Sequence, residues 1–137
     1  MLIKNTDYQE LNTIWEIKQN CVEYLSYLNI KTWDEKYPSF ALFEASQKKK
    51  HLYTIFENEE IIGSVCVDQE MSDEYAQISW SNESYRTIHR LMINPKMQGR
   101  GFGKAVMNEI EKELIKKGIS TIRLAVYQHN IYANLMY

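Results

Sequence analysis

The sequence predicts a mixed α/β fold of the α+β class, in which helices flank one mixed sheet. Three observations support this prediction. β-like and helical segments follow one another in the order β-α-α-β-β-β-α-β-α. Segment 104–117 is strongly helical, because apolar residues recur at every fourth position from Phe102 to Leu114. This helix joins two β-like runs, 87–93 and 121–126, and such a unit forms a right-handed parallel crossover.

The other elements follow from caps, periodicity and turn residues. Thr6 or Asp7 caps the first helix and Ser39 caps the second, because their side-chain oxygens can accept from free N–H groups of the first turn. A hairpin turns at Asn58-Glu59. The remaining predicted ranges are a strand at 2–4, helices at about 8–28 and 39–49, a loop at 31–38, hairpin strands at 52–56 and 61–67, a short strand at 77–80 and a turn at 81–85.

Composition limits the function classes. A chain of 137 residues with 45% hydrophobic and 25% charged residues is expected to be one globular domain, spanning 1–137. With 16 basic and 18 acidic residues, nothing suggests a nucleic-acid surface. The only cysteines, Cys21 and Cys66, lack metal-ligand spacing, and we expect no metal. No apolar run is long enough for a membrane span and no signal peptide is recognisable, so a cytoplasmic protein without membrane contact is expected.

The most informative segment is the glycine-rich run 98–104, placed between strand 87–93 and the helix. Its three glycines stand at alternate positions, 99, 101 and 103. The first turn of a helix has N–H groups without intrahelical partners, and the helix dipole is positive there. Such a loop therefore suits an anion, and phosphate best. The spacing fits neither a Walker A loop nor the G-x-G-x-x-G dinucleotide fingerprint.

The run instead matches Gln/Arg-x-x-Gly-x-Gly/Ala through Gln98, Gly101 and Gly103. It resembles the pyrophosphate loop of the GNAT superfamily, the acyl-CoA-dependent N-acyltransferases. The resemblance extends to strand 88–93 before the loop and to strand 122–126 after it. It continues through the ordered set Asn130, Ala133 and Tyr137.

The resemblance implies that the fourth and fifth strands are parallel and splay apart, so that acetyl-CoA, the co-substrate, enters the gap. The backbone of Leu91, Met92 and Ile93 would then hold the acyl carbonyl and the pantetheine, and Asn130 would hydrogen-bond the pantetheine arm. The residues that would wrap the pyrophosphate are Gln98, Gly99, Arg100, Gly101, Phe102, Gly103 and Lys104. The side chains of Arg100 and Lys104 either add charge or face solvent.

By the same resemblance, the reaction is transfer of an acetyl group from acetyl-CoA to a primary amine of a small molecule or peptide. Tyr137 occupies the position of the family's acid, which protonates the leaving thiolate; packing at a helix end is the alternative. Some members place a glutamate base where this chain has Thr87. His89, on the same strand face, is the candidate base, although a structural role is equally open. Glu74, Glu83 or water are the other possibilities.

The acceptor pocket is expected between the first helix, loop 31–38 and residues 70–82. Two sets of side chains are candidates, and the residues do not identify the acceptor. The aromatic set, for which core packing is the alternative, comprises Tyr24, Tyr27, Trp33, Tyr37 and Trp80. The acidic set, which would suit a cationic amine, comprises Asp34, Glu35, Asp68, Glu70, Asp73 and Glu74.

One departure from the family pattern concerns the end of the chain. Family domains usually continue past the tyrosine with two more strands, whereas this sequence stops at Tyr137. We therefore expect a C-terminally short domain whose strand 121–126 is an open sheet edge, and self-association of segment 121–137 as a homodimer. The departure also leaves open an alternative function, a non-catalytic acyl-CoA-binding or interaction module.

Overall fold

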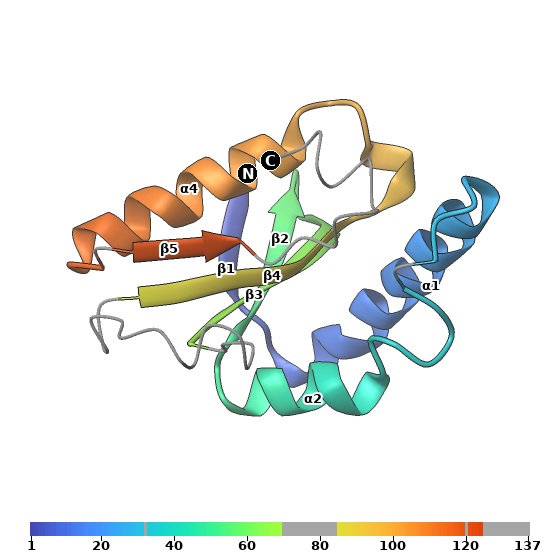
Figure 1. Cartoon of the computed structure of the whole chain (residues 1–137), viewed down its shortest axis with the longest axis horizontal. Coiled ribbons are helices and arrows are strands. Elements are labelled where there is room, and N and C mark those ends of the chain that lie inside the picture. Colours follow the sequence, from blue (N-terminus) through green and yellow to red (C-terminus); the bar gives the residue numbers. More distant parts are fainter. Residues whose placement is uncertain (32, 70–84, 120, 125–137) are drawn as a thin grey trace.

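The computed structural model describes residues 1–31, 33–69, 85–119 and 121–124 (Figure 1). Within them the chain alternates short strands and helices much as the sequence predicts. In chain order the elements are β1 (Leu2–Asn5), the 3₁₀ turn η1 (Tyr8–Glu10), α1 (Leu11–Tyr27), α2 (Phe40–Lys48), β2 (Leu52–Glu57), β3 (Glu60–Asp68), β4 (Tyr85–Ile93), the 3₁₀ turn η3 (Pro95–Met97), α4 (Phe102–Lys116) and β5 (Thr121–Leu124).

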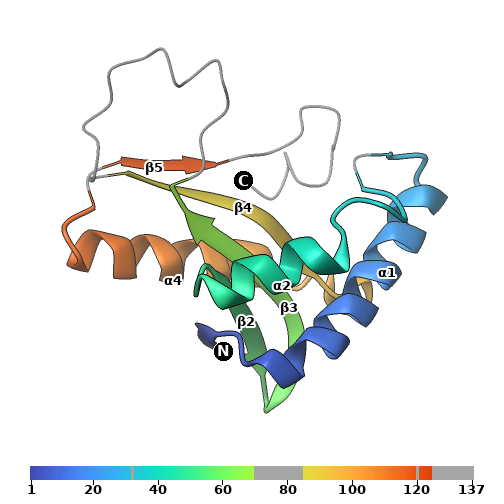
Figure 2. The ribbon, with the colours of Figure 1, turned by 90° about the horizontal axis from the view of Figure 1, so that it is seen from below.

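The strands form one mixed sheet, which confirms the predicted α+β class. Its order is β1-β2-β3-β4-β5, and neighbouring strands are antiparallel except for the parallel pair β4 and β5. Helix α4 covers one face, whereas α1 and α2 cover the other (Figures 1 and 2). The helix after the glycine-rich loop thus makes the parallel crossover that the sequence predicts.

Each face of the sheet has its own apolar cluster. On the α4 face, Val106, Ile110 and Leu114 pack against sheet residues such as Ile55 and Val65. On the opposite face, α1 and α2 residues pack against Leu52 and Met92, and the α1–α2 part of this cluster is Leu11, Ile14, Ile17, Cys21 and Phe43. The fourfold spacing of apolar residues in α4 therefore marks its buried side, as expected.

The predicted caps and turns are partly confirmed. Ser39 caps α2, since its Oγ accepts from the N–H of Leu42 at 3.1 Å. Thr6 does not cap the first helix; it is buried, and its hydroxyl lies 2.8 Å from that of Thr54. Asp7 is the N-cap residue of η1, which precedes α1, and its N–H donates to Oε1 of Glu10 at 2.9 Å. The short strand predicted at 77–80 lies outside the described residues.

Strand β4 contains a bulge that matters for the site. Cys66 pairs with His89 and Ser64 with Met92, so two residues of β4, Arg90 and Leu91, lie opposite Val65. Arg90 has a φ of 51°, in the left-handed region. The described pairs between β4 and β5 run only from Tyr85↔Thr121 to Ile88↔Leu124. The bulge therefore lies two residues after the last described pair of this parallel ladder.

Candidate functional site

The glycine-rich loop joins η3 to α4 and has the backbone that an anion site requires. Gly99 and Gly101 have φ values of 80° and 79°, and Gly101 is the N-cap of α4. A Cβ at either position would meet no heavy atom within 4 Å. Glycine is needed here for the left-handed backbone rather than for room among protein atoms. The N–H groups of the first helical turn lack intrahelical acceptors and remain available to a ligand.

One side-chain hydrogen bond ties the loop to the end of β4, and two further contacts hold that end against α1 and β3. Gln98 donates its Nε2 to the carbonyl oxygen of Ile93 at 3.4 Å, and the thiol of Cys21 reaches the same oxygen at 3.5 Å. The N–H of Asn94 donates to the carbonyl of Ile62 at 2.7 Å. The Gln98 side chain thus faces the strand, and Arg100 is exposed. Lys104 is also exposed, so both cations remain accessible to a phosphate.

The stretch from Leu91 to Ile93 lies immediately before η3 and this loop. The side chains of Met92 and Ile93 are buried in opposite apolar clusters, and both residues pair with β3 on one side. On the other side, the last described pair with β5 is Ile88↔Leu124. Where a strand end has no protein neighbour, its backbone groups can pair with an extended ligand. The end of β4 and the anion loop are continuous along the chain, which suits a long ligand with a phosphate end.

His89 belongs to a buried polar cluster on the α2 face, before the bulge. Its Nε2 lies 2.7 Å from Oδ2 of Asp68, and these side chains are 8% and 11% exposed. Burial by itself lowers the pKa of His89, and Arg90 acts in the same direction. The hydrogen bond to Asp68, together with contact with Cys66, outweighs both and raises this pKa to about 9. His89 is therefore a charged partner of Asp68 at neutral pH.

Cys66 and Arg90 complete this cluster. Cys66 Sγ lies 3.5 Å from Asp68 Oδ2, and Nη2 of Arg90 lies 3.5 Å from the same sulfur and 3.3 Å from Ser46 Oγ. Cys66, Asp68 and His89 are of the types that ligate transition metals, and their ligand atoms lie within 4.8 Å of one another. However, the Asp68 carboxylate already has an imidazolium partner, and a guanidinium stands beside the sulfur. These contacts favour an ion-paired cluster over a cation site.

The sequence did not indicate the contact between Asp68 and His89. It suggested Asp68 only as one of several carboxylates for a cationic amine, and it placed His89 by its strand position alone. The two residues are 21 positions apart and come together through the β3–β4 register. The only sequence signal for this contact was an acidic residue at the end of one predicted strand and a histidine in the next predicted strand.

The residues expected on the acceptor side are dispersed. Trp33 packs against the cluster that contains Met92, whereas Tyr27 is 87% exposed. Oδ1 of Asp34 accepts from the N–H groups of Lys36 and Tyr37, both at 2.8 Å. These bonds lower the pKa of Asp34 and close the loop on itself.

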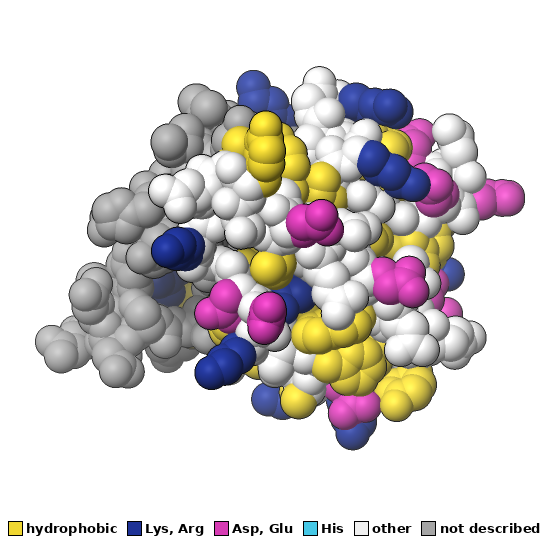
Figure 3. All heavy atoms as spheres, turned by 90° about the vertical axis from the view of Figure 1, so that its right-hand side faces the viewer, with side chains coloured by type: hydrophobic (Ala, Val, Ile, Leu, Met, Phe, Trp, Pro, Cys, Tyr) yellow, Lys and Arg dark blue, Asp and Glu magenta, His cyan; other side chains and the backbone are white. Residues whose placement is uncertain are grey.

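Several expected residues fall outside the described part of the chain. They are Glu70, Asp73, Glu74, Trp80, Glu83, Asn130, Ala133 and Tyr137. Their roles therefore remain predictions. The face of the molecule that carries α1 has acidic and basic side chains interspersed among apolar ones (Figure 3). The described side chains on this face form no large patch of a single charge.

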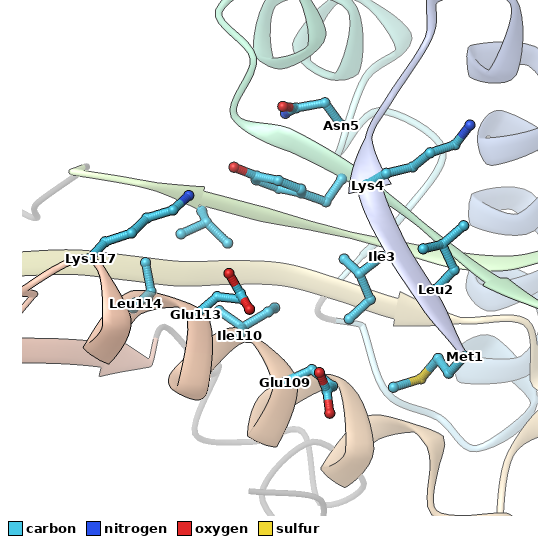
Figure 4. A pocket seen from close by; sticks show the side chains of 12 residues that line it. Met1, Leu2, Ile3, Lys4, Asn5, Glu109, Ile110, Glu113, Leu114 and Lys117 are labelled. Atoms are coloured by element: carbon cyan, nitrogen blue, oxygen red, sulfur yellow. The ribbon is translucent and has the colours of Figure 1, made fainter.

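A separate cavity of about 430 Å³ opens between β1 and α4 (Figure 4). Its apolar walls come from residues such as Ile3 and Leu114, and its rim carries Lys4, Glu109 and Lys117. From Glu109 onward, these α4 residues lie roughly 12 Å or more along the helix axis from Gly101, the N-cap of α4. The cavity is therefore distinct from the candidate site.

The family comparison agrees with this geometry. The model of the acetyltransferase (GNAT) family matches residues 11–137. The chain belongs to the GNAT acetyltransferase family. A comparison with curated proteins gave no match. Among the described residues, no helix of this GNAT protein is long and apolar enough to cross a membrane.

Solved structures of GNAT proteins share the fold. A GNAT-family acetyltransferase from Listeria monocytogenes has a TM-score of 0.78 and 18% identity over 99% of this chain and 82% of its own. The PaiA N-acetyltransferase from Thermoplasma acidophilum, solved with coenzyme A, has a TM-score of 0.74 and 19% identity over 99% and 85%. A predicted acetyltransferase from Clostridium acetobutylicum, solved with acetyl-CoA, has a TM-score of 0.60 and 15% identity over 99% and 88%.

Proposed function

We propose that this chain transfers an acetyl group from acetyl-CoA to a primary amine of a small molecule or peptide. The observation that carries the proposal is the continuity of two backbone features. The end of β4, with its bulge at Arg90, runs directly into the anion-binding loop around Gly99 and Gly101. A ligand with an extended amide arm and a pyrophosphate fits both at once, and acetyl-CoA has this chemistry.

In this proposal the backbone of Leu91, Met92 and Ile93 receives the acyl carbonyl and the pantetheine. Loop residues 98–104 receive the pyrophosphate, and Asn130 binds the pantetheine arm. The solved relatives from Thermoplasma acidophilum and Clostridium acetobutylicum, which contain coenzyme A and acetyl-CoA, support this choice of donor. At 15–19% identity they share the fold, so the acceptor has to be found by experiment.

The reaction needs a neutral amine as nucleophile and a proton for the leaving thiolate. We assign the second task to Tyr137 and the first to His89. The ion pair with Asp68 limits His89, because an imidazolium cannot accept a proton. With a pKa of about 9, a growing fraction of His89 becomes competent only as the pH rises toward that value. If His89 is the base, the rate should therefore increase with pH up to about pH 9. In His89→Gln this increase should disappear.

A coenzyme A release assay against a panel of primary amines tests the proposal. Turnover with at least one amine, dependent on acetyl-CoA, is the expected result. Tight binding of acetyl-CoA without turnover across the panel, repeated on a chain extended beyond residue 137, would favour the acyl-CoA-binding module instead. The panel also sorts acceptors by size and charge, which is the property that the fold alone leaves open.

Tyr137→Phe tests the acid. Removing a general acid lowers kcat by typically about 10²–10⁴-fold, while the dissociation constant of acetyl-CoA stays the same because the hydroxyl acts on the departing sulfur. The measurement is kcat under conditions in which chemistry limits the rate, with the acetyl-CoA Kd measured in parallel. Full kcat in the Phe variant would leave Tyr137 with a packing role.

We also propose that the protein forms a homodimer through segment 121–137. Within the described residues, β5 is an edge strand of the sheet, and an edge strand offers unpaired backbone groups to a second chain. Sedimentation across a concentration series tests this proposal. Dissociation to monomers on dilution is expected, whereas a monomer at every concentration would contradict it.

A further inference from the structure

Helix α1 contains a buried ammonium group that the proposed reaction does not use. Lys18 is 1% exposed. Its Nζ donates to the carbonyl oxygen of Asp34 at 2.6 Å and lies 4.7 Å from the centre of the Trp15 ring. The contact joins α1 to the loop formed by residues 33–38, hereafter the 33–38 loop.

Stability alone does not explain this lysine. Burial lowers the pKa of Lys18, which means that the folded protein disfavours its charge; the nearby Asp34 and Glu35 offset this only in part. An apolar side chain of similar volume at such a position is often neutral or stabilising. A buried cation with one carbonyl acceptor is therefore retained at a cost, which indicates a task other than holding the core.

The partner of Lys18 is an ordered loop next to the candidate site. Asp34 closes the 33–38 loop by accepting from two of its N–H groups, and the N–H of Asp34 donates to the carbonyl of Tyr37 at 2.9 Å. Trp33 packs on the apolar cluster that includes Met92 of β4. From the same helix as Lys18, Cys21 reaches the carbonyl oxygen of Ile93. The loop thus lies on the helix that contacts the proposed acyl site.

We infer that Lys18 is a positioning residue whose ammonium fixes the shape of the 33–38 loop and thereby shapes the binding site of the acceptor amine. The part of the inference that concerns the acceptor rests on the proposed function. The part that concerns the loop rests on the contacts given above. Lys18 touches neither substrate. Its ammonium holds the carbonyl of Asp34 from the buried side of the loop. The solvent-exposed side of the loop therefore keeps a single conformation.

Lys18→Met tests this role, because methionine fills a similar volume without charge or donor. The matched control is Lys112→Met, which changes an exposed lysine on α4. We expect the KM of the acceptor in Lys18→Met to rise about tenfold or more, because small displacements of positioning groups have large effects. The Kd of acetyl-CoA should be unchanged in Lys18→Met. The midpoint of urea unfolding should be unchanged or higher. A lower midpoint with an unchanged acceptor KM would show a purely structural lysine and overturn the inference.

Hydrogen exchange provides a readout that does not depend on activity. The amides of Lys36 and Tyr37, which donate to Asp34, should exchange clearly faster in Lys18→Met than in wild type or Lys112→Met. Unchanged exchange would overturn the inference even in an active enzyme. If the wild type acetylates no amine in the panel, the proposed function fails and takes the acceptor role with it. Exchange then decides by itself whether Lys18 fixes the loop.

Discussion

At the scale of single residues, the two ends of α4 provide a matched pair of glycines. Gly101 and Gly118 have φ values of 79° and 83°, and a Cβ at either would meet no heavy atom within 4 Å. A left-handed alanine costs roughly 1–2 kcal/mol at each position. Gly101→Ala and Gly118→Ala should therefore lower the free energy of unfolding by similar amounts, measured in urea.

Binding should separate the same two variants. The open space at Gly101 is where the proposed pyrophosphate lies, so Gly101→Ala should raise the Kd of acetyl-CoA about tenfold or more, the value of one lost charge-assisted hydrogen bond. Gly118→Ala should bind as wild type does. Equal Kd values for the two folded variants, measured by calorimetry, would contradict the assignment of the loop.

His89 predicts a dependence of stability on pH. Its folded pKa of about 9 lies above the ordinary value of 6.5, so the pair with Asp68 contributes stability that is complete below pH 6.5 and is lost as the pH rises through 9. This rise of the pKa corresponds to a contribution of roughly 3 kcal/mol to the free energy of unfolding. The difference in unfolding free energy between wild type and His89→Gln should therefore be largest near about pH 6 and shrink toward about pH 10. A difference that stays constant with pH would contradict the ion pair.

Single residues also show which contacts can be predicted from the sequence and which cannot. The loop glycines could be predicted because their function depends on local backbone geometry, read over a few adjacent positions. The partners of His89 and Lys18 could not. Each contact joins segments that are 21 and 16 positions apart, through strand register or a loop that returns to its helix. A buried lysine within an amphipathic helix pattern gives no local sign of its acceptor.

At the scale of elements, β3 supports the end of β4. The hairpin before it was predicted from Asn58-Glu59, and both residues adopt the positive φ values that tight hairpin turns favour, 51° and 68°. The bulge at Arg90 was not predictable, since arginine has no preference for a positive φ. The guanidinium contacts with Ser46 and Cys66, from α2 and β3, hold it.

Neighbouring positions of β3 should respond in opposite directions to alanine. A Cβ at Gly63 would lie 2.1 Å from the carbonyl oxygen of Met92, and the backbone of β4 cannot rotate away as a side chain can. Gly63→Ala should lower the free energy of unfolding by about 3 kcal/mol or more.

The hydroxyl of Ser64 is buried without a hydrogen-bond partner among the described residues. Ser64→Ala should be neutral or stabilising by about 1 kcal/mol. Urea unfolding of both variants checks the pair, and a destabilised Ser64→Ala would reveal a partner of that hydroxyl.

At the scale of the whole molecule, one sheet couples two layers. The loop and the first turn of α4 belong to the layer on one face, whereas Lys18 and the 33–38 loop belong to the other. β4 lies between them and places Met92 in one apolar cluster and Ile93 in the other. A ligand that binds the edge of β4 and the loop therefore contacts the element shared by both layers. The mixed sheet and its crossover were predictable from element order and periodicity. Which face receives Met92 and which receives Ile93 was not, because the bulge shifts the alternation of β4 by one residue.

Binding of acetyl-CoA should consequently stabilise the folded chain as a unit. A ligand that binds only the native state at a free concentration of 100 times its Kd adds about 2.7 kcal/mol to the free energy of unfolding. We expect this increment in wild type and in Gly118→Ala. In Gly101→Ala, a Kd raised tenfold would reduce it to about half, roughly 1.4 kcal/mol, at the same ligand concentration. Tryptophan fluorescence and far-ultraviolet circular dichroism should shift together, because Trp15 and Trp33 pack on the face opposite α4. A ligand-dependent shift in only one probe would show that the two layers unfold separately, and the same increment in Gly101→Ala would place the ligand away from the loop.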